Sequence, residues 1–173
     1  MLDSFYTTFF RPSAARFSAP VAIAIGLLIV FVLALNAAGT AGFGIGGAIG
    51  FIVLFAFAGL LGWFWLSAAV NLLAQLLGGP ADGSTTMQAV AQGLSPLILT
   101  APAIAASKWS DALGNLFSFA ISIAVLVTLA IAIRNAHHLT WLKSILTLAI
   151  SLVVAFLALS GLILWPVMVI LGM

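Results

Sequence analysis

Long apolar stretches separated by short polar segments dominate this chain. Five such stretches occur, at about residues 20–38, 45–70, 89–106, 113–133 and 142–164. Most of them reach the length of roughly 20 residues that an α-helix needs to cross a hydrocarbon core about 30 Å thick. The pattern therefore predicts an all-α, polytopic integral membrane protein built as a bundle of five transmembrane helices.

Turn-forming residues mark the ends of these spans. Residues 39–42 close the first span, residues 78–84 form a turn after the second, and Trp165-Pro166 interrupts the apolar tail after the fifth. The third span contains Pro96 and Pro102. Each proline removes a backbone donor and clashes with the preceding turn, so we expect a kink there. Residues 1–18 then form a short N-terminal segment before a transmembrane domain of residues 19–173.

Charged residues are scarce and lie outside the longest apolar runs. They make up 5% of the chain, against roughly a quarter in soluble domains, while 65% of the residues are hydrophobic. Lys and Arg on short loops are retained in the cytoplasm. A cytoplasmic N-terminus places Arg11, Arg16, Arg134 and Lys143 inside and leaves Lys108 outside. We therefore expect the C-terminus to be external.

The composition also bears on chemistry. The chain has no cysteine, which excludes disulfides, thiolate metal sites and a thiol nucleophile. Its Lys and Arg residues form no basic face of the kind that binds nucleic acid. No predicted span centre carries a carboxylate, Lys, Arg or His, which disfavours an ion-coupled carrier. We expect a non-enzymatic protein without a metal or cofactor.

Small and polar residues at helical spacing indicate how the helices associate. Gly42, Gly46 and Gly50 repeat every four residues and predict a helix-packing face. Polar residues fall on one side of several helices, so they are predicted to face the bundle interior. These bundle-facing polar residues include Asn71, Gln92, Ser95, Asn115, Ser118, Ser122 and Ser151.

Those polar residues could instead line a substrate path. The alternative function is then a small transporter or lipid-handling protein that moves its kinked third span. It requires a cavity bordered by Gln92, Ser95 and Asn115. A close-packed apolar centre would contradict this alternative.

Two motifs could suggest a cofactor. Residues 42–47 match the G-x-G-x-x-G pattern, but a dinucleotide site needs a preceding strand and an acidic residue about twenty positions on, and the next acidic residue here is Asp82. His137 and His138 have too few neighbouring ligands for a metal, and we expect solvated histidines at the membrane interface. One of them could ligate a haem or pigment. With Arg134 and Lys143, they form a predicted partner-facing loop.

Two segments resemble the Yip1-domain family. In the first, Gly78-Gly79 ends the long second span and Gln92-Gly93-Leu94-Ser95-Pro96 opens the third. In the second, Arg134 to Ser144 contains the His pair, a Leu-Thr pair and Lys143 before the last span. The resemblance covers most of the chain from about Ala19 and implies five spans with a cytoplasmic N-terminus.

The resemblance also implies a type of function. Eukaryotic members of that family interact with prenylated Rab GTPases and with each other in early secretory membranes. Only about eighteen residues precede the first span here, which argues against a Rab-type GTPase partner and for a prokaryotic member in the plasma (inner) membrane. We expect a scaffold or small subunit that associates with other membrane proteins in the bilayer.

Overall fold

The computed structural model describes residues 19–40 and 45–170, and every element in these two ranges is helical. The elements are α2 (Ala19–Thr40), α3 (Ile45–Leu76), α4 (Gly83–Gly93), the 3₁₀ helix η1 (Ser95–Leu99), α5 (Thr100–Ser107), α6 (Asp111–His137) and α7 (Trp141–Ile170). Four helical segments, Gly46–Leu76, Gly83–Ser107, Asp111–His137 and Trp141–Ala158, are long and apolar enough to cross a membrane, and α2 has a shorter described apolar stretch, Gly26–Leu35. The predicted all-α membrane bundle is thus confirmed.

Several helices continue beyond the predicted spans. Helix α3 has 32 residues and ends at Leu76, so it continues past the core of the second span to the turn predicted at residue 78. At 1.5 Å per residue it is about 48 Å long, more than a hydrocarbon core of about 30 Å, so it must tilt or extend into the interface. Helix α7 continues past Pro166 to Ile170. Trp165-Pro166 therefore does not interrupt the last helix.

The predicted kink in the third span is a complete break in the α-helix. Helix α4 ends at Gly93, η1 carries Pro96 at its start, and α5 carries Pro102. The backbone N–H of Leu97 bonds to the carbonyl of Leu94 instead of that of Gly93. The Thr128 hydroxyl of α6 donates to the Gly93 carbonyl at 2.6 Å. A side chain of the neighbouring helix thereby replaces the missing backbone donor, as a break in the bilayer requires.

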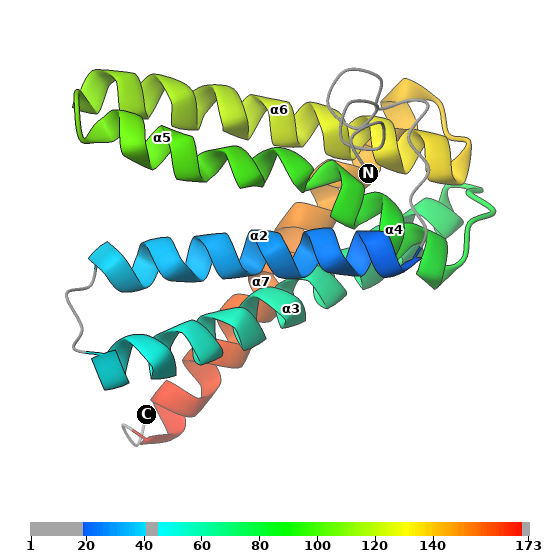
Figure 1. Ribbon diagram of the computed structural model, residues 1–173. Coiled ribbons are helices and arrows are strands. Elements are labelled where there is room, and N and C mark those ends of the chain that lie inside the picture. Colours follow the sequence, from blue (N-terminus) through cyan, green and yellow to red (C-terminus); the bar gives the residue numbers. More distant parts are fainter. Residues whose placement is uncertain (1–18, 41–44, 171–173) are drawn as a thin grey trace.

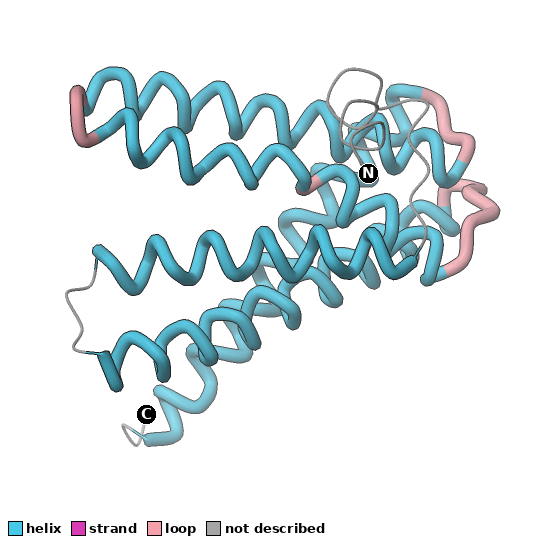
Figure 2. The backbone as a smooth tube through the Cα atoms, viewed as in Figure 1, coloured by secondary structure: helices cyan, strands magenta, loops and turns pink. Residues whose placement is uncertain are grey.

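The helices diverge from one end of the molecule (Figure 1). The turn after α3 and the turn between α6 and α7 lie at the same end, while the short turn between α5 and α6 lies at the other, as the loops in Figure 2 show. Arg134 and Lys143 flank the turn between α6 and α7. We call this end, with residues 77–82 and 138–140, the basic end.

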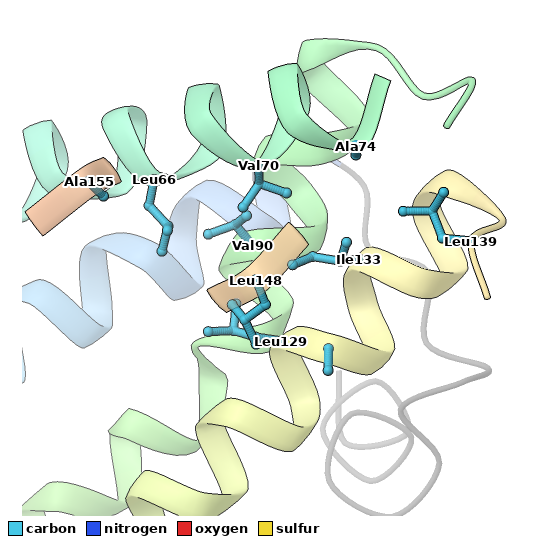
Figure 3. Close-up of a cluster of buried hydrophobic side chains, with 10 residues drawn as sticks. Leu66, Val70, Ala74, Val90, Leu129, Ile133, Leu139, Leu148 and Ala155 are labelled. Atoms are coloured by element: carbon cyan, nitrogen blue, oxygen red, sulfur yellow. The ribbon is translucent and has the colours of Figure 1, made fainter. Parts of the chain in front are cut away.

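The apolar core lies toward the basic end. Its buried residues come from the second half of α3, from α4, from the last part of α6, from the turn after α6 and from the first half of α7 (Figure 3). They are Leu66, Val70, Ala74, Val90, Leu129, Ala130, Ile133, Leu139, Leu148 and Ala155. Because a Cβ on Gly93 would lie 2.7 Å from the Leu129 Cα, α4 and α6 approach so closely that only glycine fits.

Candidate functional site

A buried polar cluster joins α3, α4 and α6 at the basic end. Its centre is the Thr86 hydroxyl oxygen, which lies 2.8 Å from the Asp82 carbonyl oxygen, 3.0 Å from Asn71 Oδ1 and 2.9 Å from His137 Nε2. The side chains of Thr86 and His137 are 0% and 1% exposed. These bonds link residues as far apart in the sequence as positions 71 and 137, so the cluster fixes how the three helices meet.

The start of α4 is set by its own cap. The Asp82 carboxylate accepts the backbone N–H of Thr85 at 2.9 Å and the hydroxyl of Ser84, which satisfies a donor that a helix start leaves free. Hydrogen bonds from Thr85 lower the pKa of this exposed carboxyl below its usual 3.8, and Ser84 adds to the effect. The cap places Thr86 in the first turn of α4, facing the cluster.

His137 is held against Gly79, a glycine in the turn after α3. A Cβ on Gly79 would lie 2.7 Å from both Cβ and Nδ1 of His137, so any larger residue there would displace the imidazole. His138 ends α6 in the left-handed conformation, with φ 51°, and its N–H bonds to the Arg134 carbonyl. That abrupt ending places the two adjacent histidines differently: His137 is buried and His138 is exposed.

The geometry assigns the proton on the imidazole. The Thr86 hydroxyl has one proton and already faces two oxygen acceptors, the Asp82 carbonyl and Asn71 Oδ1. His137 Nε2 must therefore be the donor to Thr86. Nδ1 is then a buried acceptor without a hydrogen-bond partner among the described residues. The Thr86 hydroxyl and the Nε2–H of His137 are thus engaged within the protein, and their bond joins α4 to α6.

The predicted partner-facing loop divides into inner and outer residues. His137 is buried, so the expectation of a solvated, partner-facing side chain was wrong for it; the close approach of Gly79 and Thr86 explains the difference. His138 and Lys143 are exposed, and Lys143 Nζ donates to the Leu77 carbonyl at 2.9 Å. Arg134 is half-buried, with its guanidinium 4.7 Å above the Trp141 ring.

The predicted bundle-facing polar residues fall into two groups. Ser95 and Ser151 are buried, and Asn71 and Gln92 are half-buried. The other three residues, Asn115, Ser118 and Ser122, are exposed on α6, which corrects the inward orientation expected for them. The two serine hydroxyls donate to carbonyls one turn back in their own helix, those of Gly114 and Ser118. They need no partner helix, because local bonding satisfies the hydroxyl.

The predicted glycine face is open in this chain. Gly42 lies outside the described residues, and a Cβ on Gly46 or Gly50 would meet no described atom within 4 Å. Close approaches occur instead at other glycines, which the four-residue repeat did not identify. They are Gly59 against Val30, Gly79 against His137, Gly93 against Leu129 and Gly114 against Ser107.

The three residues proposed to border a transport cavity do not lie together. Gly93, next to Gln92 and close to Ser95, contacts α6 at Thr128 and Leu129. Asn115 is thirteen positions earlier in α6 than Thr128, about 20 Å away along the helix axis. A small water-filled cavity cannot be bordered by all three residues; only a cavity of the size of a lipid could reach from one to the others. The structure thus lends no support to the transporter alternative in the form that the sequence suggested.

Of the two histidines that could ligate a haem or pigment, the structure buries His137 and leaves His138 exposed. The imidazole of His137 is buried between Thr86 and Gly79, which leaves no open face for a porphyrin. Among residues 19–40 and 45–170, no group of three or more His, Cys, Asp or Glu side chains could hold a metal ion. Thr86 and Gly79 are the site residues that sequence reasoning missed; a single Thr and a Gly-Gly turn carry no signal of a partner some fifty residues away.

Comparison with protein-family models matches the Yip1 domain over residues 5–163 of the chain. This match includes both segments that carry the sequence resemblance and all of the polar cluster. Neither the curated proteins nor the solved structures contain a match.

Proposed function

The chain belongs to the Yip1 domain family, and we propose that it acts by association, as a non-enzymatic scaffold or small subunit of a membrane protein complex. Its surface for association is the outer half of α3, residues 46–58. The proposal depends on one observation: the fraction of residues buried by the rest of the protein differs strongly from one span to another.

Helix α3 is the least covered of the long spans. In its apolar window 6% of the residues are buried within the chain, against 28% in α6 and α7 and 39% in the third span. The outer half exposes large apolar side chains, and Ile49, Val53, Leu54 and Phe57 are each more than half exposed. Lipid tails are as apolar as these side chains, so their exposure alone does not indicate a protein partner.

The glycines of this surface supply the further argument. Gly46 and Gly50 lie one turn apart, and among the described residues no atom would meet a Cβ on either. A glycine inside a helix carries a cost in backbone entropy of about 0.5–1 kcal/mol relative to alanine. When another helix approaches closely, van der Waals packing against the glycines offsets that cost, and lipid tails pack against the helix less closely. Two uncovered glycines beside exposed apolar side chains therefore favour a helix from another protein.

Mild-detergent purification with mass spectrometry tests the proposal. We expect a stoichiometric membrane protein to co-purify with the wild-type chain and to be lost when Gly46 and Gly50 are both changed to Leu. Gly161→Leu is the matched control, because Gly161 in α7 is also exposed and open to a Cβ. If no partner co-purifies, or if Gly161→Leu removes it equally, the proposal fails.

The chain is an integral membrane protein, and its placement in a prokaryotic plasma membrane stays a prediction. Fractionation of cells that express the tagged chain would test it. We expect the chain in the plasma-membrane fraction, with Lys143 on the cytoplasmic face.

A further inference from the structure

We propose that Arg134 and Trp141, at the junction of α6 and α7, bind the phosphate of an anionic phospholipid headgroup. This site lies at the basic end, away from the outer half of α3. The proposal of this site does not rest on the proposed function.

The first argument is the fixed position of the guanidinium. The Arg134 side chain is half-buried, and its Cζ lies 4.7 Å from the centroid of the Trp141 ring. A guanidinium stacked over an indole is attracted to the ring face, which restricts its plane. The N–H groups at the guanidinium edge then point away from the ring in a defined direction, as bidentate recognition of a phosphate requires.

The second argument is that those donors are unused. In the part of the chain that the structure describes, the Arg134 side chain has no hydrogen bond and no carboxylate partner; its contact is the Trp141 ring. Lys143, the other Lys or Arg that the structure describes at this end, already donates to the Leu77 carbonyl. The Asp82 carboxylate is occupied by Thr85 and Ser84. A half-buried guanidinium with five free donors is better satisfied by an anion from outside.

The third argument is the depth of the pair in the bilayer. Arg134 lies in the last turn of α6, and Trp141 is the first residue of α7. Tryptophan at the end of a span favours the headgroup layer, and Arg near a span end favours the cytoplasmic leaflet, where anionic lipids gather. The first backbone N–H groups of α7 add a small attraction for negative charge at the same place. The anion available at this depth is a lipid phosphate.

Native mass spectrometry of the full chain in mild detergent tests the site, with phosphatidylglycerol and phosphatidylcholine titrated separately. We expect the wild-type chain to prefer phosphatidylglycerol, and Arg134→Gln to weaken that binding about fivefold, as expected for one interfacial cation. Lys108→Gln removes the same charge at the opposite end of the molecule and should leave the binding unchanged.

Two further arms make the result specific. Arg134→Lys keeps the charge but loses the planar fork, and it should bind phosphatidylglycerol more weakly than the wild type; it also serves if Arg134→Gln does not fold. Inorganic phosphate added in excess should not displace the lipid. The proposal is overturned if the two lipids bind equally, if Arg134→Gln and Lys108→Gln lose equal affinity, if Arg134→Lys binds as the wild type does, or if inorganic phosphate competes.

Discussion

The basic end and the opposite end of this bundle use the same kinds of residue in different ways. At the basic end, Thr86 bonds across to a neighbouring helix, and Gly79 and Gly93 lie against side chains of α6. Toward the opposite end, Ser118 bonds to its own helix, and Gly46 and Gly50 in the outer half of α3 are open. The opposite end has its own close approach, Gly114 against Ser107, but among the described residues none lies against Gly46 or Gly50 in the outer half of α3.

This difference separates the residues that hold the bundle together from the surface that could contact another protein. Lipid supplies little drive for helices to separate or to associate, so close contacts and interhelical hydrogen bonds determine the fold. The basic end concentrates those contacts around the apolar core. Because the outer half of α3 contributes no residue to the apolar core, we propose that surface as the one that binds another protein. Four substitutions probe the contrast.

The largest expected effect is at Gly93. A Cβ there would lie 2.7 Å from the Leu129 Cα, and because the backbone cannot easily yield, Gly93→Ala should lower the free energy of unfolding by about 3 kcal/mol. Denaturation in mixed micelles, followed by circular dichroism, measures the change. Gly46→Ala is the matched control and should be neutral or slightly stabilising. Equal losses in the two variants would remove the contrast between the ends.

The Thr86 hydroxyl comes next. Thr86→Val keeps the shape but leaves the buried Nε2–H of His137 without its acceptor, which should lower the free energy of unfolding by about 1–2 kcal/mol. The same denaturation assay applies. A double-mutant cycle with His137→Ala should show coupling, since each change removes the same bond. Additive losses would mean that the two side chains act separately.

The cap of α4 should make stability depend on pH. The Asp82 pKa is lowered by Thr85, so its contribution is present above the ordinary value of 3.8 and is lost as the pH falls through the lowered pKa of the folded protein. Asp82→Asn still caps the helix but does not titrate. The difference in Tm between wild type and Asp82→Asn should therefore shrink in strong acid. A constant difference would show that the carboxylate charge has no part in the cap.

The smallest effect is expected at Ser118. Ser118 is an exposed residue, and its hydroxyl donates to the Gly114 carbonyl of its own helix. Ser118→Ala should change the free energy of unfolding by less than about 0.5 kcal/mol, as for a surface substitution. If Ser118→Ala lowered the free energy of unfolding as much as Thr86→Val does, the result would support the inward orientation of Ser118 that the sequence suggested.

The sequence predicted the spans better than the contacts between them. Span positions and the break near Pro96 follow from hydropathy and from the missing proline N–H, both of which are local properties. The burial of His137 depends on Gly79, which is far away in the chain, and no local pattern reports that approach. Helical spacing placed Ser118 on a polar face, but the spacing could not show that its hydroxyl is satisfied within α6.

Cross-linking in intact membranes tests most directly whether the outer half of α3 is an association surface. The chain has no cysteine, so single cysteines can be placed at Val53 in α3 and at Leu157 in α7, which are both 62% exposed. With a thiol-attached photoreactive group, which inserts into the C–H bonds of an apolar neighbour, the account predicts a discrete higher-mass product for Val53→Cys and little or none for Leu157→Cys. Equal products from the two positions, or no product at Val53→Cys, would contradict it.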